Sequence, residues 1–224
     1  MNNIFIGWDS REDIAYEVCK HSILARSNAS KFNVQPLKLH ELRQQNIIWR
    51  ENDQRASTEF TFTRFLVPYL NQYKGWALFC DCDFLFLEDI QKLFDLADPS
   101  KAIMCVQHDY IPSESTKMDN KPQEMYPRKN WSSLILYNCE HPSNQQVNLD
   151  FVNKCPMGYM HQFKWVKDEE IGSLPYQWNY LEGWYNSNDA KAVHYTRGGP
   201  WFGNWQHVDY AKEWQDEAAK YQGV

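Results

Sequence analysis

Residues 76–87 read WALFCDCDFLFL, an apolar run that two carboxylates interrupt, Asp81 and Asp83. The first half of this run is short and apolar, and helix-like sequence follows the run, which predicts a buried strand. Ligands of open α/β sheets bind at the carboxyl ends of the strands. Because a carboxylate is costly to bury unless positive charge neutralises it, we expect a cationic side chain or a metal ion at this strand end.

The rest of the chain alternates between strand-like and helix-like segments, as an α/β domain does. Strand signals occur at residues 4–6, 32–39, 102–106, 133–137 and 192–195. Helical spacing of apolar residues occurs after a predicted capping box at 10–13, and again at 57–70 and 90–96. We expect a single domain over residues 1–224, with variable loops at 40–56 and 108–128 and a closing amphipathic helix over 207–224.

Composition argues against several classes of protein. The formal charge is −6 and no dense run of Lys or Arg occurs, which argues against a nucleic-acid binder. No apolar segment approaches the ~20 residues of a transmembrane span, and the first residues do not resemble a signal peptide, so we expect a cytoplasmic protein without a transmembrane segment. The six cysteines form no CxxC pair, which favours reduced thiols over a zinc site.

A late histidine supplies a third polar group. His194 ends a predicted strand, and a glycine-rich turn at 198–199 follows it. Two carboxylates and an imidazole suit Mn²⁺ or Mg²⁺, with positions left open for phosphate oxygens. A single DxD triplet or a single histidine is a weak signal, but together they favour a metal site made by Asp81, Asp83 and His194. Arg64, in the segment before the acidic strand, is either a solvated helix charge or a clamp for an anion.

These motifs resemble the GT-A nucleotide-sugar glycosyltransferases. The acidic strand, the TRFL segment at 63–66 and the HYTRGGPW segment at 194–201 most resemble family 8, the glycogenin and bacterial galactosyltransferase group. The resemblance runs from residue 4 to about 201 and leaves the two variable loops unmatched. It implies a Rossmann-like, mostly parallel sheet flanked by helices. It also implies metal-dependent transfer of a hexose from a nucleoside diphosphate sugar, UDP-glucose or UDP-galactose, to a hydroxyl of a glycan or other acceptor, with retention.

The same resemblance implies roles for individual residues. Asp81, Asp83 and His194 would bind Mn²⁺ (or Mg²⁺), with Asp81 also near the ribose. Asp168 and Glu169 would lie beside the anomeric carbon and stabilise the oxocarbenium-like transition state. The remaining contacts to the UDP-sugar would come from Gly7, Trp8, Asp9, Arg64, Asn130, Arg197 and Gly198.

The sequence departs from the family pattern at several of these positions. Asn130 stands in Asn-Trp-Ser-Ser, where the family more often has Asn-Ala-Gly. Gly199 replaces a lysine that would hold the diphosphate, and Arg197 is the candidate to substitute for it, since a guanidinium chelates phosphate. Glu169 occupies the place of a glutamine.

Other classes of protein remain alternatives. A phosphatase of the haloacid dehalogenase type also carries DxD at a strand end, but on its first strand. A nucleotidyltransferase pairs carboxylates with Mg²⁺ but requires a basic glycine-rich loop near the start, which residues 7–10 do not provide. A non-catalytic nucleotide-sugar-binding module would share the aromatic richness.

Overall fold

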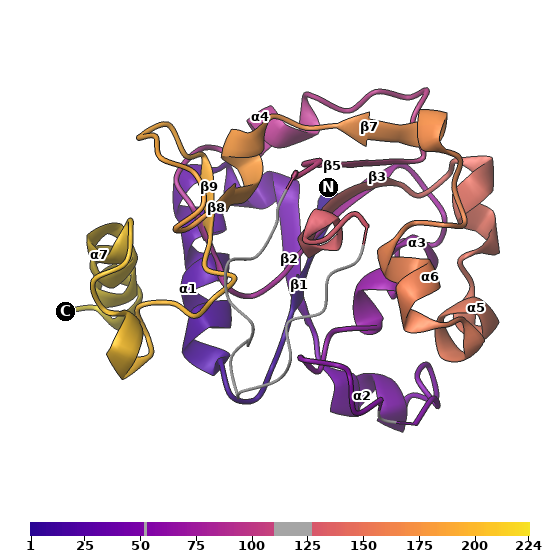
Figure 1. Ribbon diagram of the computed structural model, residues 1–224, viewed down its shortest axis with the longest axis horizontal. Coiled ribbons are helices and arrows are strands. Elements are labelled where there is room, and N and C mark those ends of the chain that lie inside the picture. Colours follow the sequence, from indigo (N-terminus) through magenta and orange to yellow (C-terminus); the bar gives the residue numbers. More distant parts are fainter. Residues whose placement is uncertain (52, 110–126) are drawn as a thin grey trace.

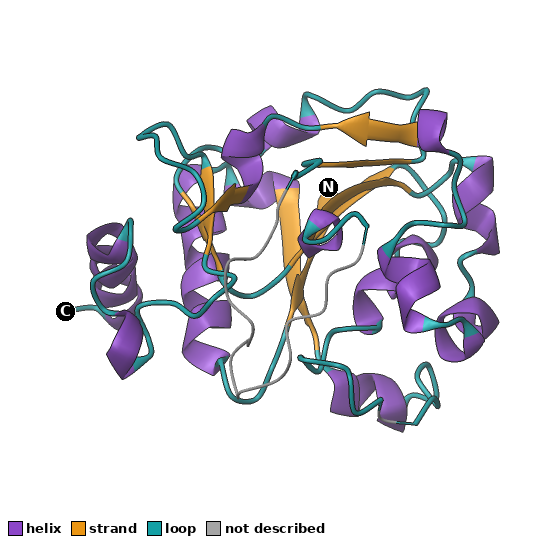
Figure 2. Ribbon diagram, in the orientation of Figure 1, coloured by secondary structure: helices purple, strands orange, loops and turns teal. Residues whose placement is uncertain are grey.

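The computed structural model describes residues 1–51, 53–109 and 127–224, and its strands form two sheets (Figure 1; Figure 2). The larger sheet has the strand order β2-β1-β3-β6-β5-β7, and the smaller has the order β4-β9-β8. The strands are β1 Asn2–Gly7, β2 Phe32–Leu37, β3 Trp76–Cys80, β4 Phe84–Phe86, β5 Ile103–Cys105, β6 Leu134–Asn138, β7 Ile171–Ser173, β8 Tyr180–Leu181 and β9 Ala192–His194.

Helices flank the larger sheet, with α1 on one side in Figure 1 and α3, α5 and α6 on the other. The α-helices are α1 Asp13–Arg26, α2 Leu39–Gln44, α3 Val67–Leu70, α4 Gln91–Phe94, α5 Leu149–Lys154, α6 Met157–His161 and α7 Ala211–Gln222. Short 3₁₀ helices cover Ala29–Lys31, Thr63–Leu66, Trp131–Ser133, Pro142–Gln146, Asp168–Glu170, Tyr176–Asn179 and Gly203–Trp205.

The larger sheet is mostly parallel, as predicted. β1 pairs in parallel with β2 and β3, and β5 pairs in parallel with β7. β6 runs antiparallel to both of its neighbours, β3 and β5. β3 lies between β1 and β6, and its residues from Ala77 to Cys80 are fully buried. A strand that is covered on both faces has no solvent side, which explains its continuous apolar run.

The stretch at 76–87 contributes to both sheets. After Cys80 the chain leaves the larger sheet, turns at residues 81–83, and enters the smaller sheet as β4. Asp81 and Asp83 therefore flank a bend and do not extend a strand. β4 pairs antiparallel with β9, and this register sets Phe84 opposite His194. The pairing brings the late histidine to the acidic turn.

The structure corrects the predicted start of the first helix. α1 begins at Asp13, and Glu12 precedes it without a side-chain cap bond, so the predicted capping box is wrong. The hydroxyl of Ser10 donates instead to the carboxylate of Glu59. The side chain of Ser10 thus ties the β1–α1 turn to the segment at 57–59.

Two segments before β3 also differ from the prediction. The segment at 40–56 contains most of α2 and buries Leu42 and Ile48, so it is more than a polar surface loop. The segment at 57–70 is not one continuous helix. It forms turns, a 3₁₀ helix, and then α3, with Pro68 in the first turn of α3, where proline is tolerated.

The closing helix α7 forms as predicted and packs beside α1 (Figure 1). Among the helices that the structure describes, none combines the length and apolar character needed to cross a membrane. Of the predicted loop at 108–128, residues 110–126 lie outside the described residues.

A buried carboxylate holds α7 against α1. Glu217 is 1% exposed, and it is 2.6 Å from Nδ1 of His21 and accepts a hydrogen bond from Arg26 at 2.7 Å. Burial alone would raise the pKa of Glu217, but the bonds from Arg26 and His21 outweigh burial and hold the pKa below its ordinary value. The ionised form of Glu217 therefore stabilises the contact between the two helices.

We expect E217Q to lower the free energy of unfolding at pH 7 by about 1–3 kcal/mol, because Arg26 loses a charge-assisted partner. A carboxyl group whose pKa is lowered in the folded state contributes stability that disappears as pH falls through that pKa. The difference between the wild type and E217Q should therefore shrink in acid. Urea denaturation at neutral and acidic pH measures both effects.

The matched control is D216N, which removes the exposed Asp216 partner of Lys212 on the same helix. An exposed pair of this kind contributes about 0–1 kcal/mol. Equal losses for E217Q and D216N at pH 7 would contradict the role assigned to Glu217.

Candidate functional site

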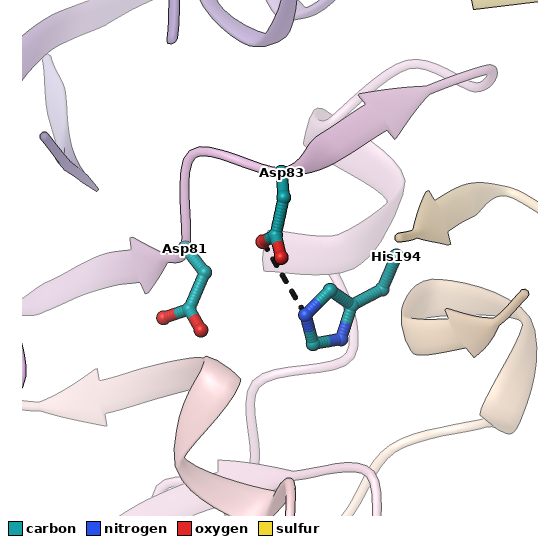
Figure 3. Close-up of side chains that lie close together, drawn as sticks. All are labelled: Asp81, Asp83 and His194. Atoms are coloured by element: carbon teal, nitrogen blue, oxygen red, sulfur yellow. Dashed lines mark ion pairs between the residues drawn. The ribbon is translucent and has the colours of Figure 1, made fainter. Parts of the chain in front are cut away.

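Three side chains that the sequence predicts as metal ligands converge at the carboxyl end of β3 (Figure 3). One ligand atom from each of Asp81, Asp83 and His194 lies within 4.8 Å of the others. Nε2 of His194 is 3.3 Å from Oδ1 of Asp83. Phe84 supports the imidazole by stacking on it, with ring centroids 4.4 Å apart. The bend after β3 and the β4–β9 pairing thus create a group of two carboxylates and one imidazole.

The donor atoms of this group fit a divalent cation. Nδ1 of His194 is hydrogen-bonded to Oδ1 of Asn179 at 2.9 Å, so in the neutral imidazole Nε2 carries a lone pair. Oδ1 of Asp83 is buried and accepts no hydrogen bond from the described residues. In that neutral form two lone pairs face one another, which a cation between them would stabilise. Oxygen and imidazole ligands suit Mn²⁺ or Mg²⁺.

Asn179 is a functional candidate that the sequence prediction missed. Its side chain is fully buried, and besides contacting His194 it donates to Oγ of Ser133 at 2.9 Å. Ser133 in turn donates to the carbonyl of Asn130 at 2.6 Å. The signal in the sequence is an amide between the aromatic residues Trp178 and Tyr180, just before a short strand, and that signal does not identify a partner.

Arg64 is a buried cation beside Asp81. Its side chain is 7% exposed, and Nη1 lies 3.0 Å from Oδ1 of Asp81 and donates to the carbonyl of Ser132 at 2.8 Å. The guanidinium also lies over the rings of Phe60 and Phe79. The alternative of a solvated helix charge is therefore wrong. Arg64 is held by its neighbours next to the acidic turn.

The turn after β1 is tied to the segment at 57–60. A Cβ at Gly7 would come within 2.5 Å of the ring of Phe60, so glycine is needed there for packing. Asp9 is fully buried, binds the guanidinium of Arg11 through both oxygens at 2.8 Å, and accepts the backbone N–H of Glu59. Burial would raise the pKa of Asp9, but these bonds outweigh it and lower the pKa.

Trp8 lies in the turn after β1 and is only partly buried. Its indole N–H donates to Asp13 at 2.8 Å, and the ammonium group of Lys38 lies 5.0 Å from the ring centroid. The side chain is thus fixed by contacts with Asp13 and Lys38, while the residue as a whole stays partly exposed.

Glu12 adds a carboxyl group that the sequence prediction did not assign to the site. It is 3% exposed. Burial, together with the charges of Asp83 and Asp9, raises the pKa of Glu12 to about 8. Most Glu12 side chains are therefore protonated at neutral pH, which limits the negative charge beside the acidic turn.

His108 is a second imidazole close to this group. It follows β5, is 6% exposed, and its Nδ1 lies 2.8 Å from the hydroxyl of Tyr185. Burial and the neighbouring His194 lower the pKa of His108 to about 3, and the Asn179 amide acts in the opposite direction. His108 is therefore uncharged at neutral pH. The sequence prediction placed it at the start of a variable loop and gave it no role.

Asn130 presents an unsatisfied donor near β6. Its backbone is left-handed, with φ of 64°. The amide Nδ2 is buried and finds no acceptor among the described residues. A non-glycine residue in this conformation costs energy, which the bonds from Ser133 to its carbonyl offset.

The residues that follow β9 are bonded to the acidic turn at one end and form an ion pair before the two glycines. The backbone N–H of Tyr195 donates to the carbonyl of Asp83 at 3.0 Å. Nη2 of Arg197 contacts both oxygens of the buried Glu182, at 3.0 and 2.9 Å. At Gly198, φ is 126° and a Cβ would lie 2.8 Å from the indole of Trp205. The charge of Arg197 is therefore already compensated within the chain.

Asp168 and Glu169 do not lie with the other candidates. They precede β7, which runs in the same direction as β3, so they are at the opposite edge of the sheet from Asp81. Asp168 is exposed and pairs with Arg128 at 2.6 Å, and the carbonyl of Glu169 accepts from Lys101. The structure does not bring these two residues to the metal site, because the DxD-bearing edge is formed by the other ends of the strands.

No protein-family model matches the chain. Protein CDI from Arabidopsis thaliana is 51% identical over 224 residues, which cover 97% of this chain and 86% of that protein. The chain belongs to the family of Protein CDI.

Solved structures show the fold of this CDI family member. The apo structure of the bifunctional glycosyltransferase WbbM superposes with a TM-score of 0.69 at 15% identity, covering 97% of this chain and 49% of WbbM. The glycosyltransferase GlyE from Streptococcus pneumoniae gives 0.60 at 11% identity, covering 97% and 60%. The chain thus spans about half of WbbM and three-fifths of GlyE.

The galactosyltransferase LgtC, in complex with donor and acceptor sugar analogs, gives a TM-score of 0.59 at 11% identity, covering 97% of this chain and 95% of LgtC. These similarities confirm the predicted GT-A glycosyltransferase fold for the CDI family member. Identities of this size show the fold alone.

The burial of Glu12, together with the charges of Asp83 and Asp9, predicts a pH effect on stability in metal-free buffer. A carboxyl group whose folded pKa of about 8 lies above its ordinary 4.5 binds more protons when folded, so wild-type stability falls as pH rises between these values. E12Q keeps the uncharged form. We expect E12Q to exceed the wild type in unfolding free energy by about 1–3 kcal/mol near pH ~8.5, and by little near pH ~5.

Chemical denaturation across this pH range, in the presence of a chelator, measures the difference. E213Q, which changes an exposed glutamate on α7, is the control and should follow the wild-type curve. Parallel curves for E12Q and the wild type would show that Glu12 ionises normally.

Proposed function

We propose that this chain is a metal-dependent glycosyltransferase of family 8. It moves a hexose from a nucleoside diphosphate sugar, UDP-glucose or UDP-galactose, to a hydroxyl of an acceptor, with retention. The observation that carries the proposal is the convergence of Asp81, Asp83 and His194 within 4.8 Å at the carboxyl edge of a sheet with the glycosyltransferase fold. Ligands of α/β sheets bind at that edge.

Mn²⁺ or Mg²⁺, when bound by these three residues, would neutralise the negative charge that develops on the departing diphosphate. The chain's contribution is to hold the ligand atoms in place beforehand. Phe84 and Asn179 fix the imidazole, and the bend after β3 fixes the carboxylates. Such preorganisation lowers the cost of assembling the site during the reaction.

Arg64 and Asn130 supply the donor contacts that the geometry supports best. Arg64 is oriented by the Ser132 carbonyl and lies against Asp81, from where its guanidinium can bind a phosphate oxygen. Asn130 presents a buried amide donor that lacks an acceptor within the described residues, and a hydroxyl of the donor sugar would supply one. The exposed part of Trp8, beside Gly7 and Asp9, is the proposed contact for the base.

Arg197 and the acidic pair Asp168 and Glu169 contact other parts of the chain. Arg197 reaches the diphosphate only if Glu182 releases it, so Gly198 and its neighbours contribute backbone groups more readily than charge. Asp168 and Glu169 sit at the far edge of the sheet, and retention therefore rests on the family resemblance and not on those two residues.

The central test is a screen of UDP- and GDP-sugars for Mn²⁺-dependent hydrolysis or transfer. We expect D81N and D83N each to lose at least about 100-fold in rate, because each removes a carboxylate that holds the cation, and the cation stabilises the leaving diphosphate. D216N changes a remote exposed carboxylate and should keep the wild-type rate. Near-normal turnover by D83N would refute the proposal.

Two further assays, UDP titration with and without Mn²⁺ and incubation with a simple phosphate ester, identify the alternatives. Metal-coupled binding of UDP without turnover of any nucleotide sugar would indicate a non-catalytic binding module. Hydrolysis of simple phosphate esters in place of nucleotide sugars would indicate a phosphatase.

A comparison of two arginines tests which one contacts the diphosphate. R64A should weaken UDP binding in the presence of Mn²⁺ by about tenfold or more, because it removes a held charge beside the metal ligands. R197A should mainly lower stability, by about 1–3 kcal/mol, because it leaves the buried Glu182 without its partner.

Calorimetric titration with UDP and urea denaturation separate the two effects. The double variant E182Q/R197Q removes both charges of the pair and should recover part of the lost stability. An equal loss of UDP affinity in R64A and R197A would show that Arg197 does substitute for the missing lysine.

A further inference from the structure

A chain of buried hydrogen bonds connects the metal-ligating histidine to the Asn130 turn. Nδ1 of His194 is 2.9 Å from Oδ1 of Asn179, Nδ2 of Asn179 donates to Oγ of Ser133 at 2.9 Å, and Ser133 donates to the Asn130 carbonyl at 2.6 Å. Asn179, Ser133 and His194 are each less than 5% exposed. We refer to His194, Asn179, Ser133 and the Asn130 carbonyl as the relay.

The direction of every bond in the relay follows from its last member. A backbone carbonyl only accepts, so the single hydroxyl proton of Ser133 is committed to Asn130. Ser133 must then accept from its other partner, which sets the NH₂ group of Asn179 toward Ser133 and its oxygen toward His194. His194 consequently donates from Nδ1, so in the neutral imidazole Nε2 carries the lone pair and faces Asp83.

Ser133 is also bonded to the other arm of the metal site. The backbone N–H of Asp81 donates to the Ser133 carbonyl at 2.9 Å. Ser133, in the Trp131–Ser133 3₁₀ helix, thus contacts the backbone of the metal ligand Asp81 directly. Through Asn179 it also contacts the buried side chain of the metal ligand His194. The same residue stabilises the left-handed turn at Asn130 through that turn's carbonyl.

We propose that Asn179 is a positioning residue for the metal site, which sets the tautomer of His194 and, through Ser133, couples the metal ligands to the Asn130 turn. The importance of this coupling for catalysis rests on the proposed function. The assignment of the His194 tautomer is independent of the proposed function. Because coupling between sites is reciprocal, cation binding at His194 and sugar binding at Asn130 should each strengthen the other.

The proposal predicts opposite behaviour for two substitutions at one position. N179L removes the acceptor from His194, and the imidazole proton then moves to Nε2, where Asp83 is the available acceptor at 3.3 Å. That proton occupies the atom needed by the cation. N179D keeps an acceptor for Nδ1–H and so preserves the tautomer, although it no longer donates to Ser133.

The first measurement needs neither metal nor substrate. Imidazole ¹⁵N shifts of His194 in the full-length chain should show Nδ1–H in the wild type and in N179D, and Nε2–H in N179L. The second measurement is Mn²⁺ affinity from the electron paramagnetic resonance of free Mn²⁺, with Mn²⁺ alone as the probe. We expect N179L to bind Mn²⁺ about 10–100-fold more weakly and N179D within about threefold of the wild type.

S133A provides an independent variant that keeps Asn179. It should retain the Nδ1–H tautomer and reduce Mn²⁺ affinity less than N179L does. It should also abolish the extra strengthening of Mn²⁺ binding that a UDP-sugar gives over UDP alone, because that part depends on the sugar at Asn130. If N179L does not fold, N179D and S133A still test the proposal. Loss of the Nδ1–H tautomer in N179D would overturn it.

Failure of this proposal and failure of the proposed function give different results. A wild-type chain with Nε2–H at His194, or N179L with unchanged tautomer and Mn²⁺ affinity, overturns the relay whatever the activity. A wild-type chain with the expected tautomer and Mn²⁺ binding that transfers no sugar overturns the enzymatic assignment and leaves the relay intact.

Discussion

The pairing of Phe84 with His194 across β4 and β9 is the contact on which the site depends. It joins two segments that are more than a hundred residues apart and sets the imidazole beside the acidic turn. The turn itself exists because the chain leaves the buried strand β3 and enters a second sheet within three residues. A DxD triplet in a continuous strand would lack this register, so the two-sheet arrangement, and not the triplet alone, creates the group of ligands.

The sequence predicts the parts of this arrangement that local pattern determines. A continuous apolar run identified β3, and two carboxylates at its end identified the ligand edge, because both signals lie within one segment. The roles of Asn179 and His108 were not predictable, since each depends on a partner from another element. Asp168 and Glu169 were assigned to the site from a resemblance, and pattern alone does not tell at which edge of a sheet a segment lies.

Aromatic and glycine residues give the site its rigidity. The ring of Phe60 fills the space beside Gly7 and lies under Arg64, while the indole of Trp205 fills the space beside Gly198. A closely packed interior resists displacement of such groups. A larger residue at Gly7 would displace the ring of Phe60, and one at Gly198 would displace the indole of Trp205. The polar side chains of the site therefore depend on both glycines for their positions. The glycine turns, which the family resemblance associates with ligand binding, have a packing role in this structure.

The balance of charge around the acidic turn leads to the metal. Asp9 is matched by Arg11, Asp81 by Arg64, and Glu12 is largely protonated because its pKa is raised to about 8. Asp83 is the remaining carboxylate, and no arginine or lysine pairs with it in the part of the chain that the structure describes. Asp83 faces the imidazole of His194 instead, and in the neutral tautomer that the relay sets, its negative charge has no cationic partner. A divalent cation would more than cancel it and leave net positive charge at the edge of the sheet, which is the electrostatic condition for holding a diphosphate.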